Sequence, residues 1–576
     1  MVNLKINNIP VQVKEGTTIL DAAKSVGINI PTLCYLKDIN EIGACRVCVV
    51  EVKGARSLVA SCVYPVNEGM EVFTNTEKVR KSRKTTIELL MSDHKKECLS
   101  CVRSTNCELQ TLSNEYGCDA AAFQGERNLS EPDDSTSYLV RDNEKCILCR
   151  RCVATCKSVQ QVAVIAPSRR GFKTHIGCAF ESDLADVPCV ACGQCIAVCP
   201  TGALHEREEI DNVREAIADP EKVVIVAPAP AVRAAIGEEF GNPVGTNTEG
   251  KMFTALRMLG FDKVFDVNFA ADLTIMEEAN ELVERVKEGG KLPMFTSCSP
   301  GWIRYVEYYY PELIPNLSSC KSPMQMFGAT VKTYYAQKEG IDPKNIYVVG
   351  VMPCTAKKFE RTRDDQSASG YPDIDAVLTT RELAKMIRTA GILYNELPDG
   401  TFDNPLGEFT GAGVIFGATG GVMEAALRTA AETITGKSLD AVDYKAVRGM
   451  QGIKEAEYDL NGLKVKVAVA SGLTNAKALC EKKKKGECDY TFVEVMCCPG
   501  GCINGGGQPI QSAYTRRTVD IKGKRAKALY DEDKKSDIRK SHENPAVNSL
   551  YKEFFGAPGS HKAHEILHTK YVNRKK

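Results

Sequence analysis

The cysteines of this chain restrict what it can fold into more than any other feature. The 576 residues include 25 cysteines, and 16 of these fall before residue 196, many of them in C-x-x-C pairs. A secreted disulfide protein would be short, whereas this chain is long and starts without the apolar run of a signal peptide. Cytosolic thiols stay reduced, so clustered cysteines there are more often metal ligands than bridges. We therefore expect several metal centres, with zinc as the alternative for any single pair.

Length and charge limit the remaining possibilities. A chain of this length predicts three to five domains. It carries 74 basic and 74 acidic side chains, a balance that argues against a nucleic-acid-binding protein. No apolar run approaches the roughly 18 residues needed to cross a bilayer. We therefore expect a soluble, cytoplasmic protein that binds neither nucleic acid nor membranes.

The first cysteine group follows a strand-like start and a helix-like segment over residues 17–28. Its spacing is C-x10-C-x2-C-x13-C, formed by Cys34, Cys45, Cys48 and Cys62. The spacing resembles a plant-type ferredoxin domain with a longer first gap, as in hydrogenases and the large subunit of respiratory NADH dehydrogenase. The resemblance implies a [2Fe–2S] cluster, with zinc as the alternative.

The second group combines one histidine with three cysteines in the spacing H-x3-C-x2-C-x5-C: His94, Cys98, Cys101 and Cys107. The spacing alone is equally compatible with a structural zinc site and an iron–sulfur cluster. Directly after a ferredoxin-like module, the group resembles the [4Fe–4S] cluster of the same two families. An imidazole in place of one thiolate leaves the cluster less negative, which should raise its potential.

The third group repeats the run C-x2-C-x2-C-x3-C, the pattern of two-cluster bacterial ferredoxins, in which the fourth cysteine of each run binds the other cluster. One [4Fe–4S] cluster should use Cys146, Cys149, Cys152 and Cys199. The other should use Cys156, Cys189, Cys192 and Cys195. Residues 1–209 thus resemble a chain of electron carriers, so the chemistry must lie downstream.

From about residue 220 the sequence takes on an α/β pattern. Short apolar runs predict buried strands over 222–227, 263–267, 292–297, 345–351 and 491–495, separated by helix-like stretches. Three of these runs lead directly into Cys298, Cys354 and Cys498. Because ligands bind at the carboxyl ends of strands in open α/β sheets, we expect one metal site between two lobes.

Three motifs around these cysteines resemble the signatures of [FeFe]-hydrogenases. They are FTSCSPGW (295–302), MPCTAKKFE (352–360) and EVMCCPGGCINGGGQP (494–509). The resemblance extends over essentially the whole chain and is to the clostridial monomeric type. It implies an H-cluster, in which a cysteine thiolate joins a [4Fe–4S] cube to a two-iron unit carrying CO, cyanide and a dithiolate amine.

The resemblance also implies roles for single residues. Cys354, Cys498 and Cys502 match ligands of the cube, and Cys502 matches the cysteine that bridges to the two-iron unit. Lys357 matches a lysine that donates to a cyanide. Residues expected around the two-iron unit are Met352, Met496, Pro230, Ala231 and Met324, of which Ala231 replaces a serine and Met324 a glutamine. The altered pair predicts a modified catalytic bias or rate.

The first motif departs from the family, because Ser299 stands where the family has a cube ligand. Cys497 and Cys320 stand where alanine is usual. Three arrangements are open: Ser299 is the ligand, or Cys298 shifts to become the ligand, or Cys497 supplies the thiolate. Iron–sulfur chemistry favours sulfur over an alkoxide. We therefore favour Cys298 as the ligand, with Cys497 or Cys320 as proton relay.

The rest of the proton path of the family has matching residues in Glu278, Glu281, Ser318 and Arg285. Glutamates at positions i and i+3 lie on one helix face and can relay protons. Without the motifs, the same residues would indicate a solvated acidic face.

The sequence therefore predicts a multidomain α+β and α/β protein with ferredoxin-like accessory domains and a large two-lobed α/β catalytic domain. The expected domains are 1–78 ([2Fe–2S]), 79–125 (histidine-ligated [4Fe–4S]), 126–209 (two [4Fe–4S]) and 210–576 (H-cluster).

The expected activity is 2H⁺ + 2e⁻ ⇌ H₂, with ferredoxin or a similar small carrier as electron partner and maturation proteins building the two-iron unit. One alternative is a hydrogen-sensing homologue with slow turnover, which the altered relay favours. Another is an electron-transfer or cluster-assembly relative without the two-iron unit, which Lys357 and Cys502 disfavour.

Overall fold

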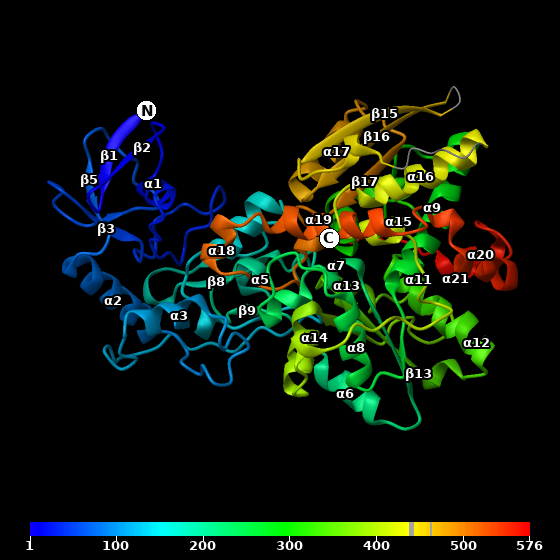
Figure 1. The fold of residues 1–576 in the computed structure, drawn as a ribbon, viewed down its shortest axis with the longest axis horizontal. Helices are drawn as coiled ribbons and strands as arrows, with labels where there is room; N and C mark the ends of the chain where they lie inside the picture. Colours follow the sequence, from blue (N-terminus) through cyan, green and yellow to red (C-terminus); the bar gives the residue numbers. More distant parts are fainter. Residues whose placement is uncertain (437–442, 461–462, 576) are drawn as a thin grey trace. The chain divides into compact units, whose positions relative to one another are not determined.

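The computed structural model describes residues 1–436, 443–460 and 463–575, and the chain divides into two compact units (Figure 1). The first consists of Met1–Cys189, Gln194–His205 and Ile510–Val519. The second consists of Val190–Gly193, Glu206–Pro509 and Asp520–Lys576. The three predicted N-terminal domains thus fall largely into one unit, and their individual boundaries stay predictions. No helix within the described ranges is long and apolar enough to cross a membrane.

The first unit begins with a five-stranded sheet in the order β2-β1-β5-β3-β4. Its strands are β1 (Val2–Ile6), β2 (Ile9–Val13), β3 (Val49–Val52), β4 (Val59–Ala60) and β5 (Glu71–Phe73). The alternating burial of β1 turns one face toward a core that it shares with helix α1 (Ile19–Ser25). Thr18 starts this helix, since its side chain accepts a hydrogen bond from Asp21 N.

The rest of the first unit contains five α-helices and two short β-ribbons, which are joined by the loops that carry the cysteines. The helices are α2 (Glu77–Ser92), α3 (Glu108–Glu115), α4 (Arg151–Ala154), α5 (Gln194–Val198) and α18 (Ala513–Thr518). Two antiparallel ribbons pair β6 (Val140–Arg141) with β9 (Leu204–His205), and β7 (Ala166–Ser168) with β8 (His175–Gly177).

Two four-stranded sheets form the frame of the second unit. The first has the order β11-β10-β13-β14 and is entirely parallel: β10 (Val223–Pro228), β11 (Lys263–Val264), β13 (Ile346–Met352) and β14 (Ala376–Thr379). The second has the order β12-β17-β16-β15: β12 (Met294–Phe295), β15 (Ile453–Leu460), β16 (Leu463–Ser471) and β17 (Phe492–Met496). Only its β15–β16 pair is antiparallel.

Helices pack around these sheets in the α/β arrangement that the sequence predicts. They are α6 (Ile210–Ala218), α7 (Pro230–Arg233), α8 (Glu249–Met258), α9 (Val267–Glu288), α10 (Pro300–Tyr309), α11 (Pro323–Thr330), α12 (Ala336–Glu339), α13 (Ala356–Glu360), α14 (Thr380–Thr389), α15 (Gly411–Ile415), α16 (Gly421–Thr435), α17 (Leu473–Lys484), α19 (Ile521–Lys535), α20 (Pro545–Leu550) and α21 (His561–Leu567). Helix α9 is capped by the side chain of Asp266 and ends at Gly289, whose φ of 74° is in the left-handed region.

The structure confirms a strand within each of the five predicted apolar runs, but the runs at 292–297 and 263–267 each contain a strand of only two residues. The second of these runs also contains the start of a helix. Only Lys263 and Val264 form a strand, and Val267 already begins helix α9. The reason is local, because Asp266 accepts a hydrogen bond from Asn268 N and so starts a helix inside the apolar run.

One buried arginine holds several helices of the second unit together. Arg233 is fully buried at the end of α7, and its guanidinium pairs with three carboxylates. They are Asp266 at 2.5 Å, Glu532 at 2.7 Å and Glu249. Since these residues belong to the starts of α9 and α8 and to α19, the charges fix the C-terminal segment against the sheet helices.

We expect Arg233→Met to lower the free energy of unfolding by about 3–5 kcal/mol, because it leaves buried carboxylates without their counter-charge. The matched control is Arg257→Met, whose guanidinium pairs with Asp403 at 2.9 Å but is 40% exposed. The control should cost less than about 1 kcal/mol. Thermal unfolding of both variants under anaerobic conditions measures the difference, and equal losses would contradict the role assigned to Arg233.

Candidate active site and iron–sulfur ligands

The four thiols of the first cysteine group form two close pairs. The Sγ atoms of Cys48 and Cys62 are 3.3 Å apart. Cys34 N lies 3.4 Å from Cys45 Sγ, and Cys45 N lies 3.5 Å from Cys34 Sγ. Hydrogen bonding to Cys34 lowers the pKa of Cys45 to about 6, so a thiolate is accessible near neutral pH. Two thiol pairs fit a cluster with two irons, each needing two cysteine ligands.

His94 has the protonation state that a metal ligand needs. It is buried, and its Nδ1 has no hydrogen-bond partner among the described residues. Burial lowers the pKa of His94 to about 4, so the imidazole is neutral at physiological pH. A buried ring nitrogen without a partner is costly, and a metal at this position would satisfy it.

The four cysteines predicted to hold one cluster of the third group lie around one cavity. Cys146, Cys149, Cys152 and Cys199 line one cavity in the first unit. Burial raises the pKa of Cys149 and Cys152 well above the usual range, which is unfavourable for thiolates unless a metal cation compensates. The residues therefore fit a [4Fe–4S] cluster with the fourth ligand from the second run.

A larger cavity in the second unit gathers the cysteines of the three downstream motifs. It contains about 820 Å³ of space free of protein atoms, part of which is open to solvent. The loops after β12, β13 and β17 contribute its cysteines, which are Cys298, Cys354, Cys497, Cys498 and Cys502, and Cys192 lies at the same wall. Apolar residues complete the lining, among them Met324, Met352, Met496, Phe416 and Pro230.

The chemistry of this lining fits an iron–sulfur cofactor. Burial and the charges of Cys498 and Cys502 raise the pKa of Cys354 above its usual range. Burial raises the pKa of Cys502 to about 12. Several thiolates cannot remain charged together in a cavity this apolar unless cationic metal balances them. Sulfur donors in such surroundings match the preference of iron–sulfur clusters.

Glycines let two of the cysteine loops meet. A Cβ atom at position 505 would lie 2.0 Å from Pro353 O, and one at position 507 would lie 3.0 Å from Cys354 N. A Cβ at Gly506 would lie 2.4 Å from Cys192 O. These glycines therefore allow the Cys502 loop to lie against the Cys354 loop.

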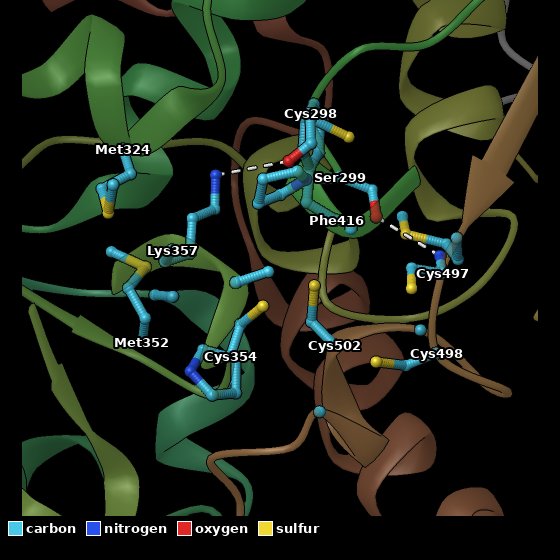
Figure 2. A pocket seen from close by; sticks show the side chains of 18 of the residues that line it. Cys298, Ser299, Met324, Met352, Cys354, Lys357, Phe416, Cys497, Cys498 and Cys502 are labelled. Carbon is cyan, nitrogen blue, oxygen red and sulfur yellow. Dashed lines mark hydrogen bonds between the residues drawn. The ribbon is translucent and has the colours of Figure 1, made fainter. Parts of the chain in front are cut away.

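Lys357 lies at the cavity wall rather than on the surface. Its Nζ donates to Glu360 Oε2 at 2.8 Å and to the Cys298 carbonyl at 3.3 Å (Figure 2). Glu360 also accepts from Ser322 Oγ at 2.9 Å, so the ammonium is held by a buried carboxylate. Sequence reasoning did not single out Glu360, although its i,i+3 spacing from Lys357 on a helix could have indicated the pair.

Cys298 and Ser299 turn to different sides of the chain. Figure 2 shows the sulfur of Cys298 directed away from those of Cys354, Cys498 and Cys502. Among charged neighbours, Glu278 contributes most to raising the pKa of Cys298, after burial itself. The Ser299 hydroxyl accepts a hydrogen bond of 3.3 Å from Cys497 N. The sequence favours Cys298 as a ligand, whereas in the structure its sulfur is directed away from those of the three other expected ligands.

Glu278 is a buried carboxyl group with few compensating contacts. It is 1% exposed, and neither oxygen makes a hydrogen bond of normal geometry to the described residues. Burial and the charge of Glu281 raise the pKa of Glu278 to about 8, while the nearby Ser318 hydroxyl and Ser297 amide oppose the shift. The group therefore exchanges a proton near neutral pH, as a relay must.

The remaining residues of the predicted path lead outward from Glu278. Ser318 Oγ donates to Glu281 Oε2 at 2.8 Å, and Arg285 Nη2 approaches Glu281 Oε1 at 2.5 Å. The Arg285 side chain is 16% exposed, so the series reaches solvent. Cys320 is fully buried, and its Sγ lies 3.7 Å from Glu281 Oε2, on the path rather than at the cavity.

Ala231 has a different environment from the one predicted. It is fully buried and packs in a cluster with Val414, Ile503 and Leu529. Its carbonyl accepts a hydrogen bond of 2.9 Å from Gln508 Nε2. Pro230, one residue earlier, lines the cavity. Because Pro230 begins a helical turn, neighbouring side chains point in different directions and only one of the two faces the site.

Five known family models match successive segments of the chain. Residues 222–506 match the iron only hydrogenase large subunit, C-terminal domain, and residues 519–574 match the iron hydrogenase small subunit. Upstream, residues 1–77 match a 2Fe-2S iron-sulfur cluster binding domain. Residues 83–121 match the NADH-ubiquinone oxidoreductase-G iron-sulfur binding region, and residues 145–203 match a 4Fe-4S dicluster domain.

Individual relatives cover the chain from end to end. The NADP-reducing hydrogenase subunit HndD of Solidesulfovibrio fructosivorans is 49% identical over the whole of both chains. Iron hydrogenase 1 of Clostridium pasteurianum is 48% identical over 99% of this chain and all of its own. The structure of a variant of apo [FeFe]-hydrogenase HydA1 from Chlamydomonas reinhardtii is 44% identical and covers 64% of this chain and all of its own, with a TM-score of 0.58. The chain belongs to the [FeFe]-hydrogenase family, with 2Fe-2S and 4Fe-4S accessory domains in front of its catalytic domain.

Proposed function

We propose that this chain interconverts protons and H₂ at an H-cluster and exchanges the electrons through four accessory clusters. The observation that carries the proposal is the convergence of three cysteine loops and Lys357 on one apolar cavity, together with a buried acidic series that begins at Glu278, the charged group with the largest effect on the pKa of Cys298 in the cavity wall. A cysteine cavity alone would suit electron transfer. The acidic series adds a route for protons, which an electron-transfer protein does not need.

Several residues would hold the cofactor. Cys354, Cys498 and Cys502 would ligate the cube, and Cys502 would bridge to the two-iron unit. Met324, Met352, Met496 and Pro230 would surround that unit with apolar atoms and exclude water. Lys357, fixed by Glu360, would donate a charge-assisted hydrogen bond to a cyanide. When bound, the cofactor supplies the iron site at which two protons and two electrons combine to H₂.

Protons would reach the cavity along the acidic face of α9. The Cys298 thiol delivers a proton into the cavity and is reprotonated by the Glu278 carboxyl group. Glu278 recovers its proton through Ser318 and Glu281, which Arg285 orients. This order follows the burial of the groups, from the fully enclosed Glu278 to the partly exposed Arg285.

Electrons would come from a reduced ferredoxin or a similar small carrier. The proposed cluster complement is one [2Fe–2S] and three [4Fe–4S] centres, one of which carries the His94 ligand. Because one relative is named an NADP-reducing subunit, assays should compare reduced ferredoxin with NADPH as donor. Maturation proteins would supply the two-iron unit.

A slow, hydrogen-sensing role is the second candidate. The observation that favours it is Ser299, whose hydroxyl is engaged with Cys497 N at a position expected to ligate the cube. A sensor and an efficient enzyme would share the cofactor and differ in turnover. Met324, which lines the cavity where the family has a glutamine, favours an altered bias or rate in either case.

The fully matured protein should evolve H₂ from reduced methyl viologen and show infrared bands of CO and cyanide. Both results together support the enzyme, since the bands report the two-iron unit and the rate reports the proton path. Bands with almost no turnover would favour the sensor. Absence of bands after maturation would leave an electron-transfer protein and contradict the proposal.

Glu278→Gln should reduce the rate of H₂ evolution at least about 100-fold, because the amide cannot pass a proton between Cys298 and Ser318. Cluster content and infrared bands should stay unchanged. Glu288→Gln, in the exposed last turn of the same helix, is the control and should retain full activity. Equal rates for the two variants would remove Glu278 from the path.

The same substitution should also stabilise the protein. The pKa of Glu278 is about 8 in the folded chain against an ordinary 4.5, so the unfolded chain ionises first as pH rises. The wild type therefore loses stability through this group between those two pH values. Glu278→Gln removes the loss, so its thermal unfolding temperature should exceed that of the wild type by more at pH 8 than at pH 6. A difference that does not change with pH would contradict the raised pKa.

A further inference from the structure

The cavity presents three expected ligand thiols for a cube that needs four donors. Cys354, Cys498 and Cys502 supply three. The fourth position of the family is Ser299, which precedes helix α10 in an extended conformation. Its hydroxyl accepts from Cys497 N at 3.3 Å (Figure 2). An alkoxide is also a poor partner for iron, since a serine hydroxyl deprotonates far less readily than a thiol.

Cys497 places a thiol beside this position. It follows β17, and the register of that strand is fixed, because β17 pairs with β12 on one side and β16 on the other. Gly472 N donates to Met496 O at 2.8 Å, so the backbone immediately before Cys497 is also held. Cys497 is 4% exposed. Its side chain therefore has a defined direction into the protein rather than toward solvent.

The direction of the Cys497 thiol is toward the other sulfurs. The thiols of Cys192 and Cys498 both raise the pKa of Cys497, and all three residues line the same cavity. Gly301 leaves the space for it, because a Cβ atom at position 301 would lie 2.7 Å from Cys497 Sγ. Gly301 is in the first turn of α10, two residues after Ser299. The Cys497 sulfur therefore packs against the segment of chain that carries Ser299 and Gly301.

Cys298 is a weaker candidate for the same role. Figure 2 shows its sulfur on the far side of the Ser299 backbone from the sulfurs of Cys354, Cys498 and Cys502. To become a ligand, it would have to exchange places with Ser299. That change would break the contact of the Ser299 hydroxyl with Cys497 N and would remove the thiol from the neighbourhood of Glu278.

We propose that Cys497 supplies the fourth thiolate of the cube and that Cys298 stays free as the proton relay. The proposal rests on the proposed function only in assuming that the cavity holds a cube. Ligation replaces the Cys497 S–H bond with an Fe–S bond and releases one proton. Ser299 then acts as a positioning residue that fixes the Cys497 backbone. The contact with Cys192, itself a predicted cluster ligand, would also give electrons a short route into the cube.

The test uses the full chain expressed without maturation proteins, so that the cube forms and the two-iron unit does not. Iron and sulfide per chain are measured, with electron paramagnetic resonance before and after mild oxidation. Cys497→Ala should lose the iron of one cluster or, on oxidation, convert it to a [3Fe–4S] form. Ser299→Ala and Cys298→Ala should keep the wild-type iron content. The signal of the [2Fe–2S] cluster reports correct folding in every variant.

The double variant Ser299→Cys with Cys497→Ala provides the rescue. It returns a thiolate to the family position, so its iron content should match that of the wild type. If Cys497→Ala keeps an oxidation-stable cube, the proposal is wrong, and Cys497 only donates a hydrogen bond between cluster ligands. Loss of iron in Ser299→Ala or in Cys298→Ala would assign the ligand to that residue instead.

These outcomes are separate from those of the activity assay. Cube content is measured without the two-iron unit, so a matured protein that lacks infrared bands would contradict the proposed function and leave the ligand assignment standing. Conversely, full activity with an intact cube in Cys497→Ala would contradict the ligand assignment and leave the function standing. After maturation, Cys298→Ala should retain the infrared bands and lose most turnover, which separates a relay from a ligand.

Discussion

The fold of the second unit depends on bringing cysteine sulfurs from three distant segments to one apolar cavity. The cysteines follow β12, β13 and β17, whose carboxyl ends belong to two different sheets. Neither sheet could form the site alone. Burial raises the pKa of Cys354 and Cys502, so their thiolates become favourable only with a metal cation among them. Folding of this region and cofactor binding are therefore linked, and the glycines after Cys502 allow the two loops to approach.

Buried charged groups of the second unit are mostly paired with opposite charges, and Glu278 is an exception. The Lys357 ammonium is held by Glu360, and the Arg233 guanidinium by three carboxylates. Among the buried carboxyl groups in the described part of the chain, Glu278 is the one whose two oxygens both lack a hydrogen bond of normal geometry. A buried carboxyl group without such a bond is unfavourable for stability, and the proton transfer proposed for Glu278 would account for its presence.

Spacing in the sequence predicted which downstream cysteines lie together at one cavity, but it could not predict the directions of their side chains. The runs before Cys354 and Cys498 are apolar and short, so the pattern alone predicted buried strands that end at these cysteines. The orientation of Cys298 relative to Ser299 did not, because neighbours in extended backbone point to opposite sides and a shift of one residue exchanges them. That register is fixed by the pairing of β12 with β17 and by the bridge between Phe295 and Leu317. The same applies to Pro230 and Ala231, which are adjacent in the first turn of α7 and whose side chains therefore point in different directions.

The C-terminal tail, residues 520–576, is an integral part of the second unit. Residues 519–574 match a family described as a small subunit, yet their charged side chains complete buried pairs with the rest of the unit. Glu532 pairs with Arg233, Asp533 with Arg428 at 2.8 Å, and Arg574 with Glu307 at 2.8 Å. Arg233, Arg428 and Glu307 are themselves fully buried or nearly so. Without the tail these groups would lose some of their counter-charges inside the protein, a state that costs several kcal/mol for each broken pair. Covalent attachment keeps the tail at high effective concentration, so the pairs form during folding of one chain and the helix that carries Glu278 is held in place.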